Sequence, residues 1–171
     1  MSQYPRNDDI LEPFRIARRL EEEGRQFFQQ AAAETESRLA QQTFEFLARE
    51  EDKHIEKIDR FYTSLEESGG KDCPEIEKSD AEQRLAAFND MLAQLKDEIK
   101  PTVTDIEAYR LALKFENGAE EFYAAQIRQT DNPRITKFYR WLIEEEKMHA
   151  RLLKSCLNFV ENPGEWFRKR R

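Results

Sequence analysis

The feature that most constrains the fold of this chain is an internal repeat with an offset of 95 residues. The offset pairs three ionisable residues with residues of the same type: Glu21 with Glu116, Glu51 with Glu146, and His54 with His149. Apolar and acidic neighbours follow it too: Phe27 with Phe122, Leu47 with Leu142, Glu50 with Glu145, and Phe46 with Trp141. Such a repeat indicates two similar units packed around an approximate two-fold axis.

Apolar residues recur at helical spacing within each unit, so we expect four long helices. The first is expected to begin near Asp9–Pro13 and to end near Thr35. The other three are expected over Ser37–Ser68, Thr104–Thr130 and Pro133–Asn162. Gly69 and Gly70 end the second helix, as glycines after a helix commonly do. Thr104 with Glu107 predicts a capping box at the start of the third, and Asn132 before Pro133 predicts the cap of the fourth.

The lengths of the connections predict the topology. The breaks at Glu36–Ser37 and Asp131–Pro133 are short, so each unit is an antiparallel hairpin. Residues 69–101 are long enough to travel the length of the bundle, and Pro101 ends them. They contain a short amphipathic helix with the apolar residues Leu85, Phe88, Met91, Leu92 and Leu95. We therefore expect an all-α, ferritin-like four-helix bundle with one long crossover.

Composition agrees with this fold class. Charged residues make up 37% of the chain and only 5 residues are glycine, which favours long solvated helices over a sheet. A chain of 171 residues suits one domain, which we place at residues 1–163, with a basic tail at 164–171. We expect the tail to be a disordered end. The alternative is that Trp166 and Phe167 dock on a partner or seal a dimer.

Charge and cysteine content exclude several classes of function. The net charge of −7 argues against nucleic acid as a partner, since phosphate binding needs a basic surface. No apolar run approaches the roughly 20 residues that span a bilayer. The N-terminus has no apolar signal region, so the expected compartment is the cytoplasm. The two cysteines, Cys73 and Cys156, cannot form a four-thiolate metal site, and Cys156 is expected in the core.

The six repeated ionisable residues interrupt the apolar stripes of their helices. Burying unpaired carboxylates costs more than the roughly 5–15 kcal/mol stability of a domain, so something must compensate them. Lysine and arginine are nearly absent from these stripes, with Arg25 the exception. Metal ions are the better solution. Four carboxylates are balanced by two divalent cations, so the charge count favours a dinuclear site.

The spacing of these residues predicts their roles. A glutamate and a histidine three residues apart share a helix face, as in Glu51–His54 and Glu146–His149. We expect Glu51 and Glu146 to bridge two metals, Glu21 and Glu116 to be terminal ligands, and each histidine to bind one metal. Oxygen donors with imidazoles suit Fe(II) or Mn(II) and tolerate Zn(II). The adjacent glutamates are expected to be solvated or to support the ligands: Glu22, Glu23, Glu50, Glu144 and Glu145.

The alternative is a solvated helix face with incidental histidines. It must explain why the only two histidines of the chain each follow a glutamate by three residues. It must also explain a further glutamate 30 residues before each of these pairs. We therefore favour the metal site.

This four-part pattern resembles the rubrerythrins and other ferritin-like di-iron proteins. That family has a glutamate on the first and third helices and a Glu-x-x-His motif on the second and fourth. The segments that carry the resemblance are Glu21–Phe28, Glu51–His54, Glu116–Tyr123 and Glu146–His149. The resemblance covers roughly residues 10–160, and it implies two iron ions as cofactors.

The chain also departs from the family pattern. Rubrerythrins carry an extra glutamate where this chain has Ala119, and Glu120, one residue later, is a further candidate ligand. They place a tyrosine seven residues after each terminal glutamate, and these positions are Tyr123 and Phe28 here. Tyr123 is therefore a candidate for a hydrogen bond to a ligand carboxylate. The rubredoxin-like cysteine domain of rubrerythrins is absent, so an external electron donor is expected.

The resemblance implies an oxidoreductase that reacts Fe(II) with H2O2 or O2. Its role would be the scavenging of peroxide or oxygen under oxidative stress, or ferroxidase chemistry. Two alternatives remain open: a non-catalytic protein that binds or handles iron, and a di-iron hydroxylase. We also expect a homodimer or a higher homo-oligomer.

Overall fold

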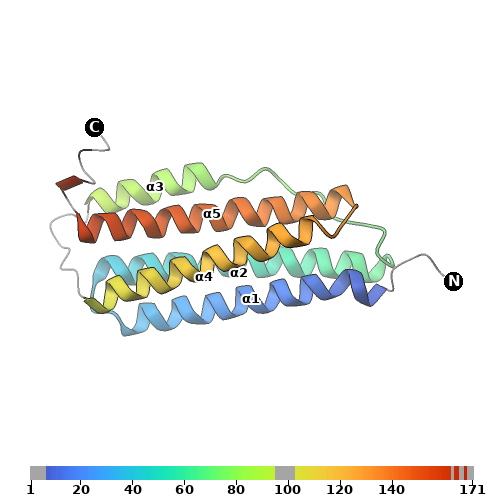
Figure 1. The fold of residues 1–171 in the computed structure, drawn as a ribbon, viewed down its shortest axis with the longest axis horizontal. Helices are drawn as coiled ribbons and strands as arrows, with labels where there is room; N and C mark the ends of the chain where they lie inside the picture. The colour runs from blue at the N-terminus through green and yellow to red at the C-terminus, as the bar shows by residue number, and fades with distance from the viewer. Residues whose placement is uncertain (1–6, 95–102, 163, 166–167, 169–171) are drawn as a thin grey trace.

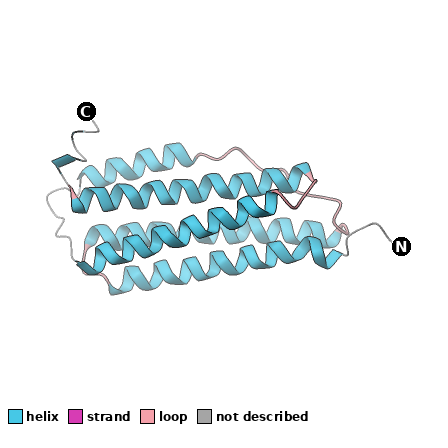
Figure 2. Cartoon of the chain, in the orientation of Figure 1, coloured by secondary structure: helices cyan, strands magenta, loops and turns pink. Residues whose placement is uncertain are grey.

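The computed structural model describes residues 7–94, 103–162, 164, 165 and 168 (Figure 1). None of these residues lies in a β-strand (Figure 2). The helices are α1 (Asn7–Glu34), α2 (Arg38–Glu67), α3 (Ala81–Gln94), α4 (Val103–Ile127) and α5 (Pro133–Glu161). The predicted all-α class is confirmed.

The four long helices are arranged as two antiparallel hairpins, α1 with α2 and α4 with α5 (Figure 1). Helices α2 and α4 run in the same direction, which requires the connection between them to return along the bundle. Helix α3 lies in that connection and packs against α5. This is the predicted bundle of two hairpins joined by a long crossover.

Local sequence signals account for three helix ends. The Ser37 side chain accepts a hydrogen bond from the Ala40 N–H and caps α2. Asn132 caps α5 in the same way, with Pro133 at the first helical position. Gly69 and Gly70 have φ values of 66° and 84°, and the Gly70 N–H donates to the Leu65 carbonyl at 2.7 Å. Positive φ at these glycines ends α2 in a Schellman-type turn.

Two helix starts differ from the prediction. Helix α1 begins at Asn7, which places Pro13 inside it although Pro13 has no N–H for the Asp9 carbonyl. The neighbouring Phe14 is buried in the core. The predicted capping box at Thr104 is wrong, because α4 begins at Val103.

Helix α4 makes a tertiary contact near its start. The Thr35 hydroxyl, in the connection between α1 and α2, donates to Asp105 at 2.7 Å. Such a bond between residues distant in sequence leaves no signal in a local motif.

The short helix of the crossover is present, with Leu85, Phe88 and Leu92 buried and Met91 partly buried. Leu95 and Pro101 lie outside the described residues, as do Trp166 and Phe167 of the basic tail. The predictions made for these four residues therefore stay predictions.

The core consists of two apolar clusters that lie on either side of the six repeated ionisable residues. One cluster contains Phe28, Phe44 and Leu152, and the other contains Phe14, Phe61 and Phe138. Cys156 is fully buried in the first cluster, as expected. Across the described ranges, no helix combines the length and the apolarity needed to cross a membrane.

Candidate metal centre

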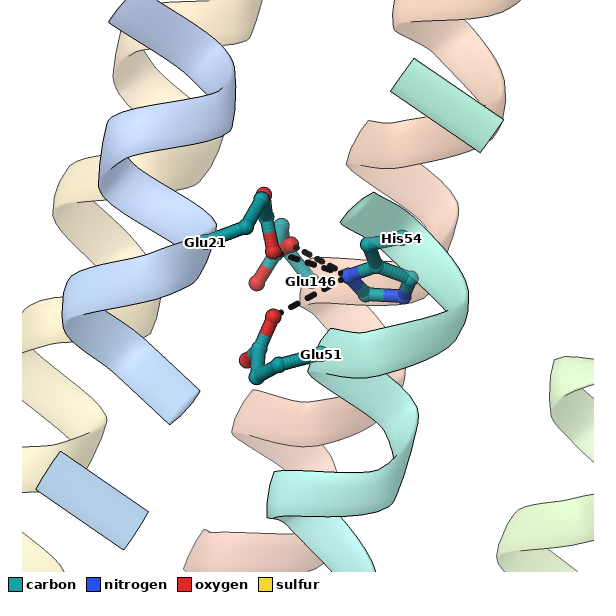
Figure 3. A group of neighbouring side chains, drawn as sticks. All are labelled: Glu21, Glu51, His54 and Glu146. Carbon is teal, nitrogen blue, oxygen red and sulfur yellow. Dashed lines mark hydrogen bonds and ion pairs between the residues drawn. The ribbon is translucent and has the colours of Figure 1, made fainter. Parts of the chain in front are cut away.

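The fold brings the six repeated ionisable residues together in the middle of the bundle. Glu21 comes from α1, Glu116 from α4, and each of α2 and α5 supplies a Glu-x-x-His pair. Each of the six is at most 2% exposed. Figure 3 shows Glu21, Glu51, His54 and Glu146 pointing toward one another from three different helices. The apolar clusters on both sides separate them from solvent.

These residues form two overlapping groups that could each hold one metal ion. The first, here called the Glu21 position, consists of Glu21, Glu51, His54 and Glu146. The second, here called the Glu116 position, consists of Glu51, Glu116, Glu146 and His149. Within each group the ligand atoms lie within 4.8 Å of one another. Only Glu51 and Glu146 belong to both groups, which is the arrangement expected of bridging carboxylates.

Both histidines turn the same ring nitrogen toward the carboxylates. His54 Nδ1 lies 3.0 Å from Glu21 Oε2, 3.2 Å from Glu51 Oε2 and 3.4 Å from Glu146 Oε1 (Figure 3). His149 Nδ1 lies 3.4 Å from Glu116 Oε1 and 3.6 Å from Glu51 Oε1. The two rings are stacked at 5.1 Å between centroids. Each imidazole therefore presents one nitrogen to the space between the carboxylates.

The unpaired atoms of this cluster fit a metal centre. Among the described residues, no carboxylate oxygen of Glu51, Glu116 or Glu146 and no ring nitrogen of His149 has a hydrogen-bond partner. The ion-pair contacts of these atoms are with one another and with His54. Buried polar atoms without partners cost several kcal/mol each unless another group compensates them. Carboxylate and imidazole donors are those that divalent transition metals prefer. The donor set thus matches a metal site in both chemistry and geometry.

The electrostatics of the metal-free cluster lead to the same conclusion. Burial, followed by the charges of Glu21 and Glu116, raises the pKa of Glu51 and of Glu146 well above the ordinary range. Burial also raises the pKa of Glu116 to about 7. These carboxyls therefore retain protons when no cation is bound, and a cation must displace those protons to bind.

A family model describes most of the chain. The rubrerythrin model matches residues 12–157, a range that contains all six clustered residues. The chain belongs to the rubrerythrin family. The matched region is the ferritin-like domain of that family, in agreement with the helical bundle. No curated protein and no solved structure gives a significant match.

In this rubrerythrin-family chain, the hydrogen bond expected from Tyr123 to a candidate ligand is present. The Tyr123 hydroxyl donates to Glu21 Oε1, on the other hairpin, rather than to Glu116 on its own helix. Burial raises the pKa of Tyr123 well above 10, so the hydroxyl keeps its proton and remains a donor. Burial would also raise the pKa of Glu21, but its neighbours Glu51, His54 and Tyr123 lower it to about 2.

The glutamates that flank the candidate ligands divide into two kinds. Glu23 and Glu144 are exposed and Glu22 is partly buried, whereas Glu50 and Glu145 are at most 2% exposed. Glu120 is partly buried and belongs to neither group around the metal positions.

The partners of the buried pair, Glu50 and Glu145, carry no signal in the sequence. Arg84, on α3, donates to both Glu50 and Glu145, and Ser79, just before α3, donates to Glu145. Both residues lie in a connection with no motif that points to the centre. Only the packing of α3 brings them to it.

Proposed function

We propose that this chain binds two iron ions and is a non-haem di-iron oxidoreductase that reacts Fe(II) with H2O2 or O2. The observation that carries the proposal is the buried set of four carboxylates and two imidazoles, divided into two groups that share two carboxylates. Membership of the rubrerythrin family also supports it.

The proposed ligands follow from the two groups. Glu21 and His54 would hold one ion, Glu116 and His149 would hold the other, and Glu51 and Glu146 belong to both groups. Four carboxylates and two divalent cations are neutral together, which suits a site surrounded by apolar residues. The two histidines and the buried carboxylates would hold both ions within one buried cluster.

When bound, two Fe(II) ions supply the two electrons that reduce H2O2, with two protons, to two molecules of water. The protein holds the carboxylates and imidazoles in place, excludes bulk water and, through Tyr123, donates a hydrogen bond to Glu21. We propose that an external reductant restores Fe(II) after each turnover.

Access to the centre limits the co-substrate to a small molecule. The candidate ligands are at most 2% exposed, and none of them lines the surface cavities beside Phe27 and Phe44, beside Trp141, or beside Phe14 and Tyr139. A hydroxylase needs an apolar cavity beside the metals for its organic substrate. The enclosed centre therefore favours peroxide or oxygen over such a substrate.

The experiment that tests the proposal is a single-turnover reaction followed by repeated turnover. Protein loaded anaerobically with two Fe(II) per chain is mixed with H2O2, or separately with O2, in a stopped-flow spectrometer. We expect oxidation within seconds, and again after each addition of a reductant. Free Fe(II) at the same concentration and protein loaded with Zn(II) are the controls. Retention of two Fe(II) without oxidation faster than that of free iron would instead support a non-catalytic iron-binding protein.

A further inference from the structure

The two metal positions have different surroundings behind their ligands. The six candidate ligands are related in pairs by the 95-residue repeat, so the repeat by itself would make the two metal positions equivalent. Helix α3 occurs once in the chain and packs on the bundle beside α5 (Figure 1). Its contacts therefore cannot be the same for both positions.

At the Glu21 position, the histidine has a carboxylate behind it. His54 turns Nδ1 toward the candidate ligands, and its other ring nitrogen, Nε2, lies 3.5 Å from Glu145 Oε2. Glu145 is itself held from the crossover. Arg84 donates to both of its oxygens at 2.6 Å, and Ser79 donates to Oε1 at 2.6 Å. A carboxylate fixed in this way orients the imidazole and strengthens it as a donor.

At the Glu116 position, the corresponding contact is missing. The repeat places Glu50 where Glu145 would be, but Glu50 binds Arg84 and Lys53, the latter at 2.7 Å. His149 Nε2 has no hydrogen-bond partner among the described residues. One arginine thus holds both glutamates, and only one of the two glutamates reaches a histidine.

Glu21 and Glu116, the proposed terminal ligands, also differ in their hydrogen bonds, and again the Glu21 position has the additional partner. Tyr123 donates to Glu21, whereas the repeat places Phe28, which has no hydroxyl, at the corresponding residue. Glu116 has no hydrogen-bond partner on either oxygen in the described part of the chain. Both supporting hydrogen bonds therefore go to ligands of the Glu21 position.

We infer that Glu145, held by Arg84 and Ser79 of the crossover, positions His54 and makes the two metal positions unequal. The Glu21 position binds its divalent cation more tightly and fills first, and the Glu116 position fills second and exchanges its ion more readily. The inference rests on the proposed metal site, but not on any reaction there. Outer partners of this kind typically change metal affinity about 10–100-fold.

Anaerobic titration of the full chain with Co(II) tests this, because the visible absorption of Co(II) reports each ion as it binds. We expect two binding steps, with affinities that differ about 10-fold or more. The single-position variants assign the steps. His149→Ala keeps the tight step, and His54→Ala keeps only the weak one.

The decisive comparison uses two glutamates related by the repeat. Glu145→Gln is expected to weaken the tight step about 10–100-fold and to leave the weak step unchanged. Glu50→Gln, the matched control, is expected to leave the tight step unchanged. Ser79→Ala removes one hydrogen bond from Glu145 and should weaken the same step by less. Circular dichroism of each metal-free variant checks that the bundle is folded.

The possible results separate this inference from the proposed function. If no Co(II) binds, the proposed metal site itself is wrong. If two ions bind with equal affinity, or if Glu145→Gln weakens both steps alike, the metal site stands and the inequality is refuted. If Glu145→Gln does not fold, Ser79→Ala replaces it, because that change leaves every charge in place. Weakening of the tight step alone then supports the inference, and equal weakening of both steps or no change refutes it.

Discussion

Helices α1 and α2 supply Glu21, Glu51 and His54 to the candidate metal centre, and α4 and α5 supply the same residue types 95 positions later. The two halves differ in what lies behind these side chains. Glu21 and His54 have hydrogen-bonding partners outside the centre, whereas His149 and the oxygens of Glu116 have none among the described residues. An internal repeat can therefore determine a set of candidate ligands, while groups that do not follow the repeat determine how those side chains are held.

The largest expected effect comes from the carboxylates that the two positions share. Glu51→Ala and Glu146→Ala remove a ligand from both positions, so we expect each variant to lose both ions. His54→Ala and His149→Ala remove a ligand from one position, so we expect about one ion per chain to remain. Metal analysis after gel filtration measures the content. Variants that all retained two ions would show that these residues do not bind the metals.

The repeat pairs Tyr123 with Phe28, and substitutions at these two residues can remove or reverse this difference between the halves. Tyr123→Phe takes a donor from the buried Glu21 carboxylate, and we expect the metal-free protein to lose about 1.5–3 kcal/mol of unfolding free energy. Chemical denaturation measures this loss. Combining it with Phe28→Tyr moves the hydroxyl to the other half. In a Co(II) titration, the double variant is then expected to bind its two ions with more similar affinities. An unchanged ratio would mean that the hydroxyl does not contribute to the difference.

The stability of the metal-free protein is expected to depend on pH. The pKa of Glu116 is raised from 4.5 to about 7 by burial, so the folded state holds this proton more tightly than the unfolded chain. The resulting stability is fully present below about 4.5 and is lost as the pH rises through about 7. Glu51 and Glu146 shift in the same direction.

Bound metal should remove this dependence, because the cations replace the protons. Denaturation of metal-free and Zn(II)-loaded protein between pH 4.5 and 8 compares the two forms. A metal-free protein whose stability rose across this range would contradict the raised pKa values.

A smaller effect is expected at a place where the two halves pack differently. The repeat pairs Gly24 with Ala119, and a Cβ at Gly24 would lie 2.9 Å from Phe115 Cε1. Gly24→Ala is therefore expected to lower the melting temperature, because Phe115 must move. Gly118→Ala is the control, since its Cβ would meet nothing within 4 Å. That change should stabilise α4 by about 0.5–1 kcal/mol. A Gly24→Ala protein as stable as the control would show that Phe115 adapts freely.

Much of the fold followed from local signals in the sequence. Helical periodicity located the five helices, and Ser37, Asn132 and the Gly69–Gly70 pair marked ends that the structure confirms. The start of α4 was predicted at Thr104, whereas Val103 is already helical, and the contact of Thr35 with Asp105 in its first turn leaves no signal in a local motif. Local motifs predict an end only where local hydrogen bonds determine it.

By itself, the sequence determined which ionisable residues face the core, because the repeat and the helical spacing both depend on the order of residues along the chain. Only the tertiary structure decided which groups support them. Tyr123 bonds to a glutamate on another hairpin, and Arg84 reaches Glu145 from the crossover helix. Periodicity reports that a side chain is buried, but not which distant residue it meets. That depends on how the helices pack, and here α3 packs beside α5 and makes two similar halves unequal.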